Sequence, residues 1–363
     1  MRKIIAYICV MLFNQIIGQE HIKNHLQTSA KNGRIPHAQL FVGKEGSGTL
    51  PVAIAYAQFL LSHFSDNPTA SELKVAKLQH PDLHFAFPVT TNDSVKKHPV
   101  SNLFLNEWRD FVSKQPYGGL FNWLQSIGVE NKQGMIGVDE ALEVVKKLQL
   151  KSYEGGFKVM IIWMAEKMNI AASNKLLKLI EEPPAKTIFL LITENEDQII
   201  TTIRSRCQAL HFPVLSEQDI ANELLIKEKC SESDALKIAT QAEGNYNKAV
   251  HLLHQDANDL IFEQWFIAWI RTAFKAKGNA AVIQELVVWS ETIAKTGRET
   301  QKQFLDYCLQ FFRQALLLNY KSPELVFLET QTPKFNLQNF APFVHSENIL
   351  AIEKELNDAL YHI

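Results

Sequence analysis

Cysteine is scarce in this chain, and the spacing of the few cysteines argues against several protein classes. The sequence has four of them, Cys9, Cys207, Cys230 and Cys308, and no Cys-x-x-Cys pair. Zinc knuckles need paired cysteines and small secreted scaffolds need a disulfide framework, so this spacing favours neither. Widely separated thiols are typical of a reducing compartment, and we expect a cytoplasmic protein.

Charge of one sign is also lacking, as are glycine and proline in excess. The 37 Lys and Arg residues nearly balance 39 Asp and Glu residues, for a net charge of −2. No global basic field therefore draws the chain to nucleic acid or to an anionic membrane. With 15 Gly, 13 Pro and 46% hydrophobic residues, the 363-residue chain is typical of a packed protein of two or three domains.

A convincing targeting segment is absent from the start of the sequence. Arg2 and Lys3 precede about ten apolar residues, but no small-residue cleavage pattern follows, and the run is too short to span a bilayer. Amphipathic sequence typical of a fold begins directly after Met11. We therefore favour Met11 as the native start and expect residues 1–10 to be a non-native or disordered extension. A weak signal peptide is the alternative.

Apolar runs alternate with helical patterns in the first half of the chain. Residues 39–43 form a short apolar run that ends in a glycine-rich loop and is followed by a helix. Residues 157–163 and 187–193 are continuous apolar runs typical of buried strands, with helical patterns before and between them. Strands without polar alternation, separated by helices, indicate a parallel sheet covered on both faces. Residues 65–135 show no regular period, and we expect only short helices and strands there.

Strand signals disappear beyond residue 212. Ser216 and Ser231 each precede a helical pattern and have an acidic residue three positions on, which is typical of a helix start. From about Leu260 every segment is helical and rich in aromatic residues. The predicted domains are an α/β domain over 11–212, a small helical domain over 213–255 and an all-α domain over 256–363.

The glycine-rich loop has the frame of a Walker A motif without its chemistry. In GxxxxGK[ST], backbone amides cradle phosphates, the lysine reaches the terminal phosphates and the hydroxyl holds Mg²⁺. Here Gly43, Gly46 and Gly48 are in place, but Thr49 occupies the lysine position and Leu50 the hydroxyl position. We expect a degenerate phosphate loop that is non-functional. A tight glycine turn with no nucleotide history is the alternative.

The acidic residue that a phosphate-loop ATPase needs at the end of its second strand is missing too. The run 157–163 continues into Met164 and Ala165, and Glu166 is offset by two or three residues. We interpret Glu166 as an exposed turn residue.

Several segments, taken in order, resemble the delta-prime subunits of the bacterial DNA polymerase III clamp loader, within the wider AAA+ clamp-loader family. The segments are IIGQEHIKNHL, GRIPHAQLFVGKEGSGTL, HPDLHF, NKLLKLIEEPP, TIFLLIT and TTIRSRCQALHF. The resemblance covers about residues 11 to 255, and the C-terminal part matches in length and character only. It implies a P-loop AAA+ domain with a parallel sheet, a helical lid and a helical collar through which five subunits form an open ring.

The most specific motifs are LLKLIEEPP and the triplet Ser205-Arg206-Cys207. In the family, the arginine of this triplet projects into the ATP site of a neighbouring subunit as an arginine finger. The resemblance therefore implies that role for Arg206, with Ser205 and Cys207 as its motif neighbours. Arg204 is a competitor, and a structural ion pair is the other interpretation of Arg206. We expect Cys207 to be a packed thiol.

The resemblance also distinguishes this chain from the ATP-hydrolysing gamma and tau subunits. Those subunits keep the Walker lysine, the acidic pair and a sensor arginine on the lid, where this chain has Asn247. Thr193 does match a sensor position. The implied function is that of a non-hydrolysing subunit that supports ATP-dependent loading of the sliding clamp onto primed DNA.

The implied partners are the delta and gamma or tau subunits, which would bind ATP and Mg²⁺ in place of this chain. Contact with the sliding clamp and primer-template DNA would be indirect, with no membrane involved. Two alternatives stay open. One is an autonomous AAA+ ATPase with a divergent site using Lys44 and Glu166, and the other is a stand-alone structural AAA+ protein that has lost its ring.

No metal site is expected. Relatives often carry a four-cysteine zinc module just before the HPDLH segment, but residues 59–79 contain no cysteine. His80, Asp82 and His84 would share one face of an extended segment. Two histidines and one carboxylate without further ligands are more typical of packing or surface residues than of a metal site.

Overall fold

The chain folds into two compact units in the computed structural model. The structure describes residues 12–129, 132–254, 257–276, 279–326, 328, 330–332 and 335–363. The larger unit spans residues 12–129 and 133–250, and the smaller unit holds residues 251–363. The predicted extension at residues 1–10 lies outside the described residues.

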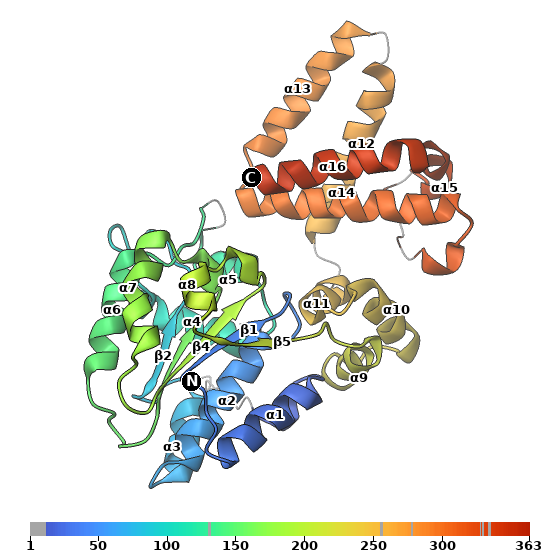
Figure 1. The fold of residues 1–363 in the computed structure, drawn as a ribbon. Helices are drawn as coiled ribbons and strands as arrows, with labels where there is room; N and C mark the ends of the chain where they lie inside the picture. The colour runs from blue at the N-terminus through green and yellow to red at the C-terminus, as the bar shows by residue number, and fades with distance from the viewer. Residues whose placement is uncertain are drawn as a thin grey trace, which may run out of the picture. The chain divides into compact units, whose positions relative to one another are not determined.

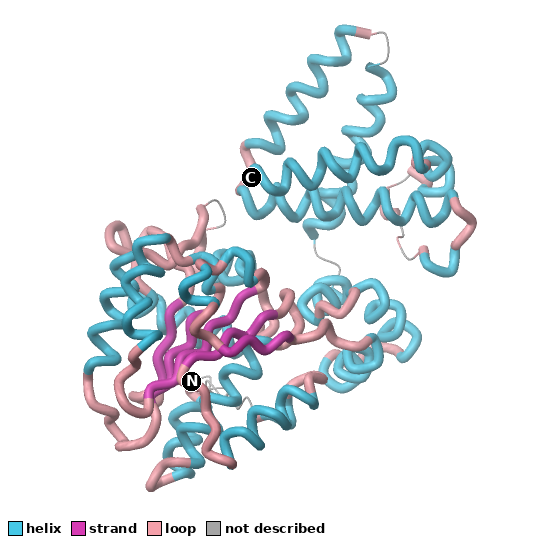
Figure 2. Tube along the Cα trace, in the orientation of Figure 1, coloured by secondary structure: helices cyan, strands magenta, loops and turns pink. Residues whose placement is uncertain are grey.

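A five-stranded parallel sheet organises the larger unit (Figure 1 and Figure 2). Its strands are β1 (Ala38–Val42), β2 (Leu83–Ala86), β3 (Lys158–Ile162), β4 (Thr187–Thr193) and β5 (Gln208–His211). Their order is β2-β3-β4-β1-β5, and every neighbouring pair is parallel. The apolar runs predicted as strands form β1, β3 and β4, the three central strands.

Helices cover both faces of the sheet, as a parallel sheet requires. One face carries α1 (Glu20–Lys31), α2 (Thr49–His63), α3 (Pro68–Ala76), α4 (Leu105–Lys114) and α5 (Leu120–Ser126). The other carries α6 (Val138–Gln149), α7 (Ile170–Glu181) and the single turn α8 (Thr201–Arg204) (Figure 1). Alternate residues of each strand enter the two apolar clusters, so β3 sends Val159 to the first and Met160 to the second.

Two strands were not located from the sequence, for different reasons. β2 lies in the stretch 65–135, where only unordered short helices and strands were predicted, and these prove to be α3, β2, α4 and α5. β5 was not predicted because it has four residues, none of them buried, and so lacks the apolar run of the central strands. It is nevertheless the strand that follows the Ser205-Arg206-Cys207 triplet.

Three helices follow the sheet in the larger unit: α9 (Glu217–Lys227), α10 (Glu232–Ala242) and α11 (Tyr246–His254). The predicted caps are confirmed, because the hydroxyls of Ser216 and Ser231 accept the amides of Asp219 and Asp234. These helices are called the lid below. As far as Val250 they belong to the same compact unit as the sheet, and the predicted boundary at residue 212 stays a prediction.

The described part of the smaller unit is helical. It contains α12 (Ala257–Ala276), α13 (Ala280–Ala294), α14 (Arg298–Asn319), the short α15 (Leu337–Phe340) and α16 (Ser346–His362). Phe266, Phe304 and Phe311 lie fully buried in its core. Among the described residues, no helix combines the length and apolarity that crossing a bilayer takes.

Short 3₁₀ helices lie between these elements, at Phe13–Gln15, Ser101–Phe104, Ala165–Lys167, Glu196–Gln198, Pro323–Leu325 and Ala341–Phe343. The predicted architecture is confirmed in the described residues: an α/β domain with a parallel sheet and a glycine-rich loop after β1, followed by three short helices and a helical C-terminal region.

Candidate functional site

The glycine-rich loop connects β1 to α2 in the shape of a phosphate loop. Gly46 and Gly48 have φ values of +73° and +92°, in the left-handed region that favours glycine. The Ser47 hydroxyl donates to the Lys44 carbonyl at 2.6 Å and closes the turn. At its start, the Gly43 amide donates to the Thr193 carbonyl at 3.0 Å, which ties the loop to the end of β4.

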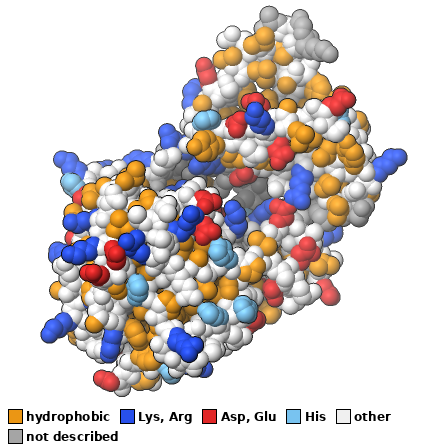
Figure 3. All heavy atoms as spheres, viewed as in Figure 1, with side chains coloured by type: hydrophobic (Ala, Val, Ile, Leu, Met, Phe, Trp, Pro, Cys, Tyr) orange, Lys and Arg blue, Asp and Glu red, His pale blue; other side chains and the backbone are white. Residues whose placement is uncertain are grey.

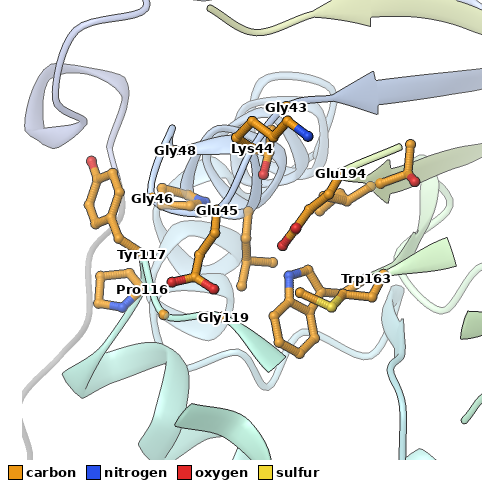
Figure 4. A pocket seen from close by; sticks show the side chains of 17 residues that line it. Gly43, Lys44, Glu45, Gly46, Gly48, Pro116, Tyr117, Gly119, Trp163 and Glu194 are labelled. Atoms are coloured by element: carbon orange, nitrogen blue, oxygen red, sulfur yellow. The ribbon is translucent and has the colours of Figure 1, made fainter. Parts of the chain in front are cut away.

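A cleft opens beside this loop, at the edge of the sheet where the strands have their carboxyl ends, called the carboxyl edge below. Parallel α/β sheets bind their ligands at this edge. The cleft encloses about 350 Å³, its open mouth included, and contains all four positions expected at a nucleotide site, Gly43, Gly46, Gly48 and Thr49. The other lining residues are Lys44, Glu45, Leu50, Pro51, Pro116, Tyr117, Gly118, Gly119, Trp163, Met164, Ile192, Thr193 and Glu194 (Figure 4).

The cleft has little positive charge to offer a phosphate. Thr49 begins α2 and is 9% exposed, and Leu50 beside it is 2% exposed, so neither the lysine nor the magnesium ligand of a Walker loop has a replacement there. Lys44 lines the cleft, but Figure 4 shows its ammonium group on the opposite side of the loop from the Glu45 carboxylate.

Carboxylates occupy the cleft instead. Glu45 and Glu194 extend into the space between the loop and Trp163 (Figure 4). The pKa of Glu194 is raised to about 7, mainly by burial and then by the nearby Glu45 and Glu166 carboxylates, against the smaller effect of Lys44 and Lys167. Negative charge that is already costly to bury disfavours a polyphosphate in the same space. Neither carboxylate was expected in the cleft. Glu45 lies within the segment GRIPHAQLFVGKEGSGTL, and Glu194 directly follows the predicted strand 187–193.

Glu166 does not line the cleft, and the expectation that it is an exposed turn residue is wrong. It lies in the 3₁₀ turn Ala165–Lys167 and is partly buried. Its Oε1 accepts the Glu194 amide at 3.3 Å, while its Oε2 is buried without a partner. The carboxylate therefore supports the turn after β4.

The lid rests directly on the loop. The Tyr246 amide, at the start of α11, donates to the Gly46 carbonyl at 3.3 Å. The Asn247 side-chain amide donates to Glu45 Oε1 and to Asn122 Oδ1, both at 2.8 Å. A Cβ atom on Gly46 would stand 1.9 Å from Asn245 Oδ1, so this close approach requires glycine. A neutral amide bonded to a carboxylate thus occupies position 247, where the resemblance implies a sensor arginine in the ATP-hydrolysing subunits.

Tyr117 and Gln19 join three segments around the same loop. The Ile17 amide donates to the Tyr117 hydroxyl at 2.9 Å, and the Tyr117 ring contacts that of Tyr246 at a centroid distance of 5.0 Å. Gln19 Nε2 donates to the carbonyls of Ser47 and Pro213. The segment before α1, the loop and the lid therefore share one buried contact region.

Thr193, the predicted sensor, ends β4 and is almost fully buried. Its hydroxyl donates to the Asn195 carbonyl at 3.0 Å and accepts the Asn195 amide at 3.2 Å. The hydroxyl is engaged in a local turn at the edge of the cleft.

Arg206 lies at the other edge of the sheet, called the amino edge below. It precedes β5, which runs parallel to β1 with Gln208 opposite Gln39. By this register, Arg206 lies opposite His37, which precedes Gly43 by six residues. Six residues of strand span about 20 Å, so Arg206 and Gly43 are about 20 Å apart along the strand direction. The geometry places this arginine away from the cleft of its own chain.

The Arg206 side chain is 34% exposed and makes two contacts. Nη1 donates to the Thr202 carbonyl at 2.9 Å, and Nη2 donates to Glu181 Oε1 at 3.1 Å. Arg204 forms a separate pair with Asp197 at 2.7 Å. The ion pair expected under the structural interpretation of Arg206 is present, and the arginine-finger role stays a prediction.

Ser205 and Cys207, the two motif neighbours of Arg206, make contacts within their own chain. The Ser205 hydroxyl donates to the Thr202 carbonyl at 3.3 Å. Cys207 packs against the apolar cluster on the α6 and α7 face, and burial raises the pKa of its thiol to about 11. The thiol is therefore protonated at neutral pH, as befits a packed side chain.

His80 and Asp82 organise the loop that precedes β3. His80 is buried, with Nε2 3.1 Å from Glu154 Oε2, and burial lowers its pKa. The Asp82 carboxylate accepts the Tyr153 amide at 2.8 Å. His84 lies on β2, where burial lowers its pKa to about 4. Within the described ranges, no three His, Cys, Asp or Glu residues are grouped to hold a metal ion.

Surface charge on the larger unit is mixed. On the face that Figure 3 shows, Lys and Arg side chains lie among acidic and apolar ones, in keeping with the net charge of −2. A role on nucleic acid therefore does not follow from the charge of this face.

A family model described as "DNA polymerase III, delta subunit" matches residues 18–216, more than half of the chain. Curated relatives agree. DNA polymerase III subunit delta' of Escherichia coli is 35% identical over 133 residues, which cover 37% of this chain and 40% of that protein. Subunit delta' of Bacillus subtilis is 29% identical over 242 residues, 66% of this chain and 60% of that protein.

DNA polymerase III subunit tau of Bacillus subtilis is 28% identical over 248 residues, 67% of this chain and 37% of that protein. The matches thus span between 37% and 60% of the length of these three relatives. Among solved structures, a gamma subunit-related protein of Thermotoga maritima matches 93% of this chain and 98% of its own at 17% identity and a TM-score of 0.38. The RuvB branch migration motor of the same organism matches 84% of this chain and 80% of its own at 13% identity and a TM-score of 0.42.

Proposed function

The chain belongs to the DNA polymerase III delta subunit family of clamp-loader proteins, and from that premise we propose that it is a non-hydrolysing, delta-prime-type subunit of a clamp loader. In this role it supports ATP-dependent loading of the sliding clamp onto primed DNA during replication. It supplies Arg206 to the ATP site of a neighbouring subunit and hydrolyses no ATP alone.

The separation of Arg206 from its own cleft carries the proposal. The cleft lies at the carboxyl edge, lacks the Walker lysine and contains Glu45 and Glu194. Arg206 lies partly exposed at the amino edge, about 20 Å away along the strands. An exposed guanidinium that cannot reach its own cleft can still stabilise charge on a phosphate of an adjacent subunit. Such an arginine is worth about 10³ to 10⁵ in rate.

Under this proposal, this chain supplies an arginine and its partner subunits bind the nucleotide. A gamma or tau subunit binds ATP and Mg²⁺ next to Arg206, and a delta subunit lies elsewhere in the same cytoplasmic ring. The smaller helical unit serves as the collar that holds the subunits together. Contact with the clamp and with primer-template DNA is indirect, which suits a chain with a net charge of −2.

The decisive experiment compares the isolated chain with a ring reconstituted from delta, gamma or tau, and this chain. We expect no ATP turnover by the chain alone. In the ring, Arg206→Ala lowers single-turnover hydrolysis at the adjacent site by a factor of about 10³. Arg204→Ala is the matched control, because Arg204 pairs with Asp197 instead. Turnover by the isolated chain, or an unchanged rate in the Arg206→Ala ring, overturns the proposal.

The two alternative functions have less support. An autonomous ATPase needs Lys44 and Glu166 together, but only Lys44 lines the cleft. For a stand-alone structural protein, the discriminating observation is co-purification: recovery of delta and gamma or tau subunits with this chain argues against it.

A further inference from the structure

We infer that Glu181 is a positioning residue, which holds the Arg206 guanidinium in the orientation that a neighbouring ATP site requires. The inference rests on the proposed function of Arg206 and adds a second residue to it. It also links the two most specific motifs of the sequence, because Glu181 belongs to LLKLIEEPP and Arg206 to the Ser-Arg-Cys triplet.

Two fixed acceptors hold the guanidinium. Glu181 Oε1 accepts from Nη2 at 3.1 Å and the Thr202 carbonyl accepts from Nη1 at 2.9 Å. A guanidinium has five N–H donors in one plane, so acceptors on two of its nitrogens fix that plane and leave three donors for a phosphate. Thr202 belongs to α8 of the same chain, so the arrangement exists before any partner binds.

The local backbone fixes the Glu181 carboxylate in turn. Glu181 is the last residue of α7, and Pro183 and Pro184 follow within three residues and cannot continue the helix. The other face of α7 anchors it, since Ile180 is fully buried in the apolar cluster. The backbone from which the Glu181 side chain extends is therefore held close to the core.

Helix stability does not account for an acid at this position. A helix has partial negative charge at its C-terminus, where Asp and Glu are unfavourable. Glu181 and its neighbour Glu182 both stand at this end of α7, but of the two only Glu181 is bonded to Arg206. Glu182 is therefore the matched control: the same residue type at the same helix end, without that bond.

The ion pair itself contributes little Coulomb energy, and three guanidinium N–H donors stay free for a phosphate while it persists. Glu181 is 53% exposed and Arg206 is 34% exposed, and solvent screens a pair of this kind. Its main effect is on side-chain freedom. Immobilising one long side chain on complex formation costs the equivalent of about 2- to 10-fold in a rate or binding constant, and Glu181 removes most of that cost in advance.

The test uses the reconstituted ring with wild-type chain, Glu181→Ala, Glu181→Gln, Glu182→Ala, Arg206→Ala and the double variant Glu181→Ala with Arg206→Ala. We expect Glu181→Ala to lower kcat for ATP hydrolysis about 2- to 10-fold with KM unchanged, because the arginine acts in the transition state. Glu181→Gln retains most of the activity, since its amide oxygen still accepts from Nη2. Glu182→Ala matches wild type.

The double variant decides whether Glu181 acts through Arg206. We expect Glu181→Ala to have no further effect once Arg206 is gone. An equal loss in that background, a wild-type or raised kcat for Glu181→Ala, or a loss in Glu181→Gln as large as in Glu181→Ala overturns the inference. If Arg206→Ala alone leaves the ring at wild-type activity, the proposed function itself fails, which separates the two outcomes.

Discussion

The two edges of the sheet differ in how their polar groups are arranged. At the carboxyl edge, the Asn247 amide donates to Glu45, so polar groups of the lid and of the loop satisfy each other within the same chain. At the amino edge, Arg206 is held by two acceptors but stays one-third exposed. At the first edge the polar groups of loop and lid bond to each other, while at the second edge Arg206 keeps N–H donors for another molecule.

Under the proposed function, that difference corresponds to the two halves of an ATP site shared between subunits. Nucleotide sites in rings need a loop that holds the phosphates and a cation from the next subunit. Here the loop shape persists in Gly46 and Gly48, while the Walker lysine is absent and the carboxylates of Glu45 and Glu194 line the cleft. A fold can keep a loop for its packing after the chemistry is lost, because the loop also joins β1 to the buried helix α2.

The largest effect that tests this comparison concerns the contact between loop and lid. Gly46→Ala should lower the free energy of unfolding by about 3 kcal/mol or more, because it adds steric overlap with Asn245 to the cost of a positive φ. Gly33→Ala is the control at the amino edge. Gly33 has a similar φ of +69° and open space around it, so about 1 to 2 kcal/mol is expected. Equal losses in denaturant unfolding would show that the lid does not rest on the loop.

A smaller effect concerns the charge of the cleft. The raised pKa of Glu194, about 7, means that its contribution to stability is fully present below the unfolded value near 4.5 and is lost as pH rises through 7. Glu194→Gln removes this loss. The free energy of unfolding of the variant, relative to that of wild type, should therefore rise by about 1 to 3 kcal/mol between pH 4.5 and pH 8. The measurement is unfolding free energy against pH. Glu182→Gln, at an exposed carboxyl, is the control. A difference between Glu194→Gln and wild type that does not change with pH would contradict a buried charge at Glu194.

The smallest effect concerns a single side chain of the lid. Asn247→Ala removes the amide that donates to Glu45 and Asn122. It should lower the free energy of unfolding by about 1 kcal/mol. Asn174→Ala, on the exposed side of α7, is the matched control and should be neutral or slightly stabilising, because alanine favours a helix. Thermal unfolding of the two variants gives the comparison, and equal midpoints would mean that Asn247 does not fasten the lid.

Much of the fold was predictable from local patterns, and the failures share a cause. The runs that became β1, β3 and β4 are continuously apolar because both of their faces are covered, so composition alone marks them. β5 is an exposed edge strand of four residues and carries no such signal. Ser216 and Ser231 were predictable as caps because a cap depends only on residues within one turn.

The candidate site divides in the same way. Loss of the Walker lysine and hydroxyl is visible at Thr49 and Leu50, since the motif has fixed spacing. The contact of Asn247 with Glu45 joins residues 202 positions apart, and that of Arg206 with Glu181 joins residues 25 apart. No local pattern encodes either contact. Glu166 was misjudged for the same reason, because its burial depends on the turn after β4.

The sequence by itself determined that this is an α/β protein with a helical C-terminal region, and that its glycine-rich loop has Thr49 and Leu50 in place of the lysine and hydroxyl residues of the Walker motif. Those properties depend on residue types at short, fixed spacings. Only the tertiary structure decided which edge of the sheet each motif occupies, because strand order and direction are set by packing between distant segments. That placement puts Arg206 at the edge opposite its own cleft, with Glu181 beside it.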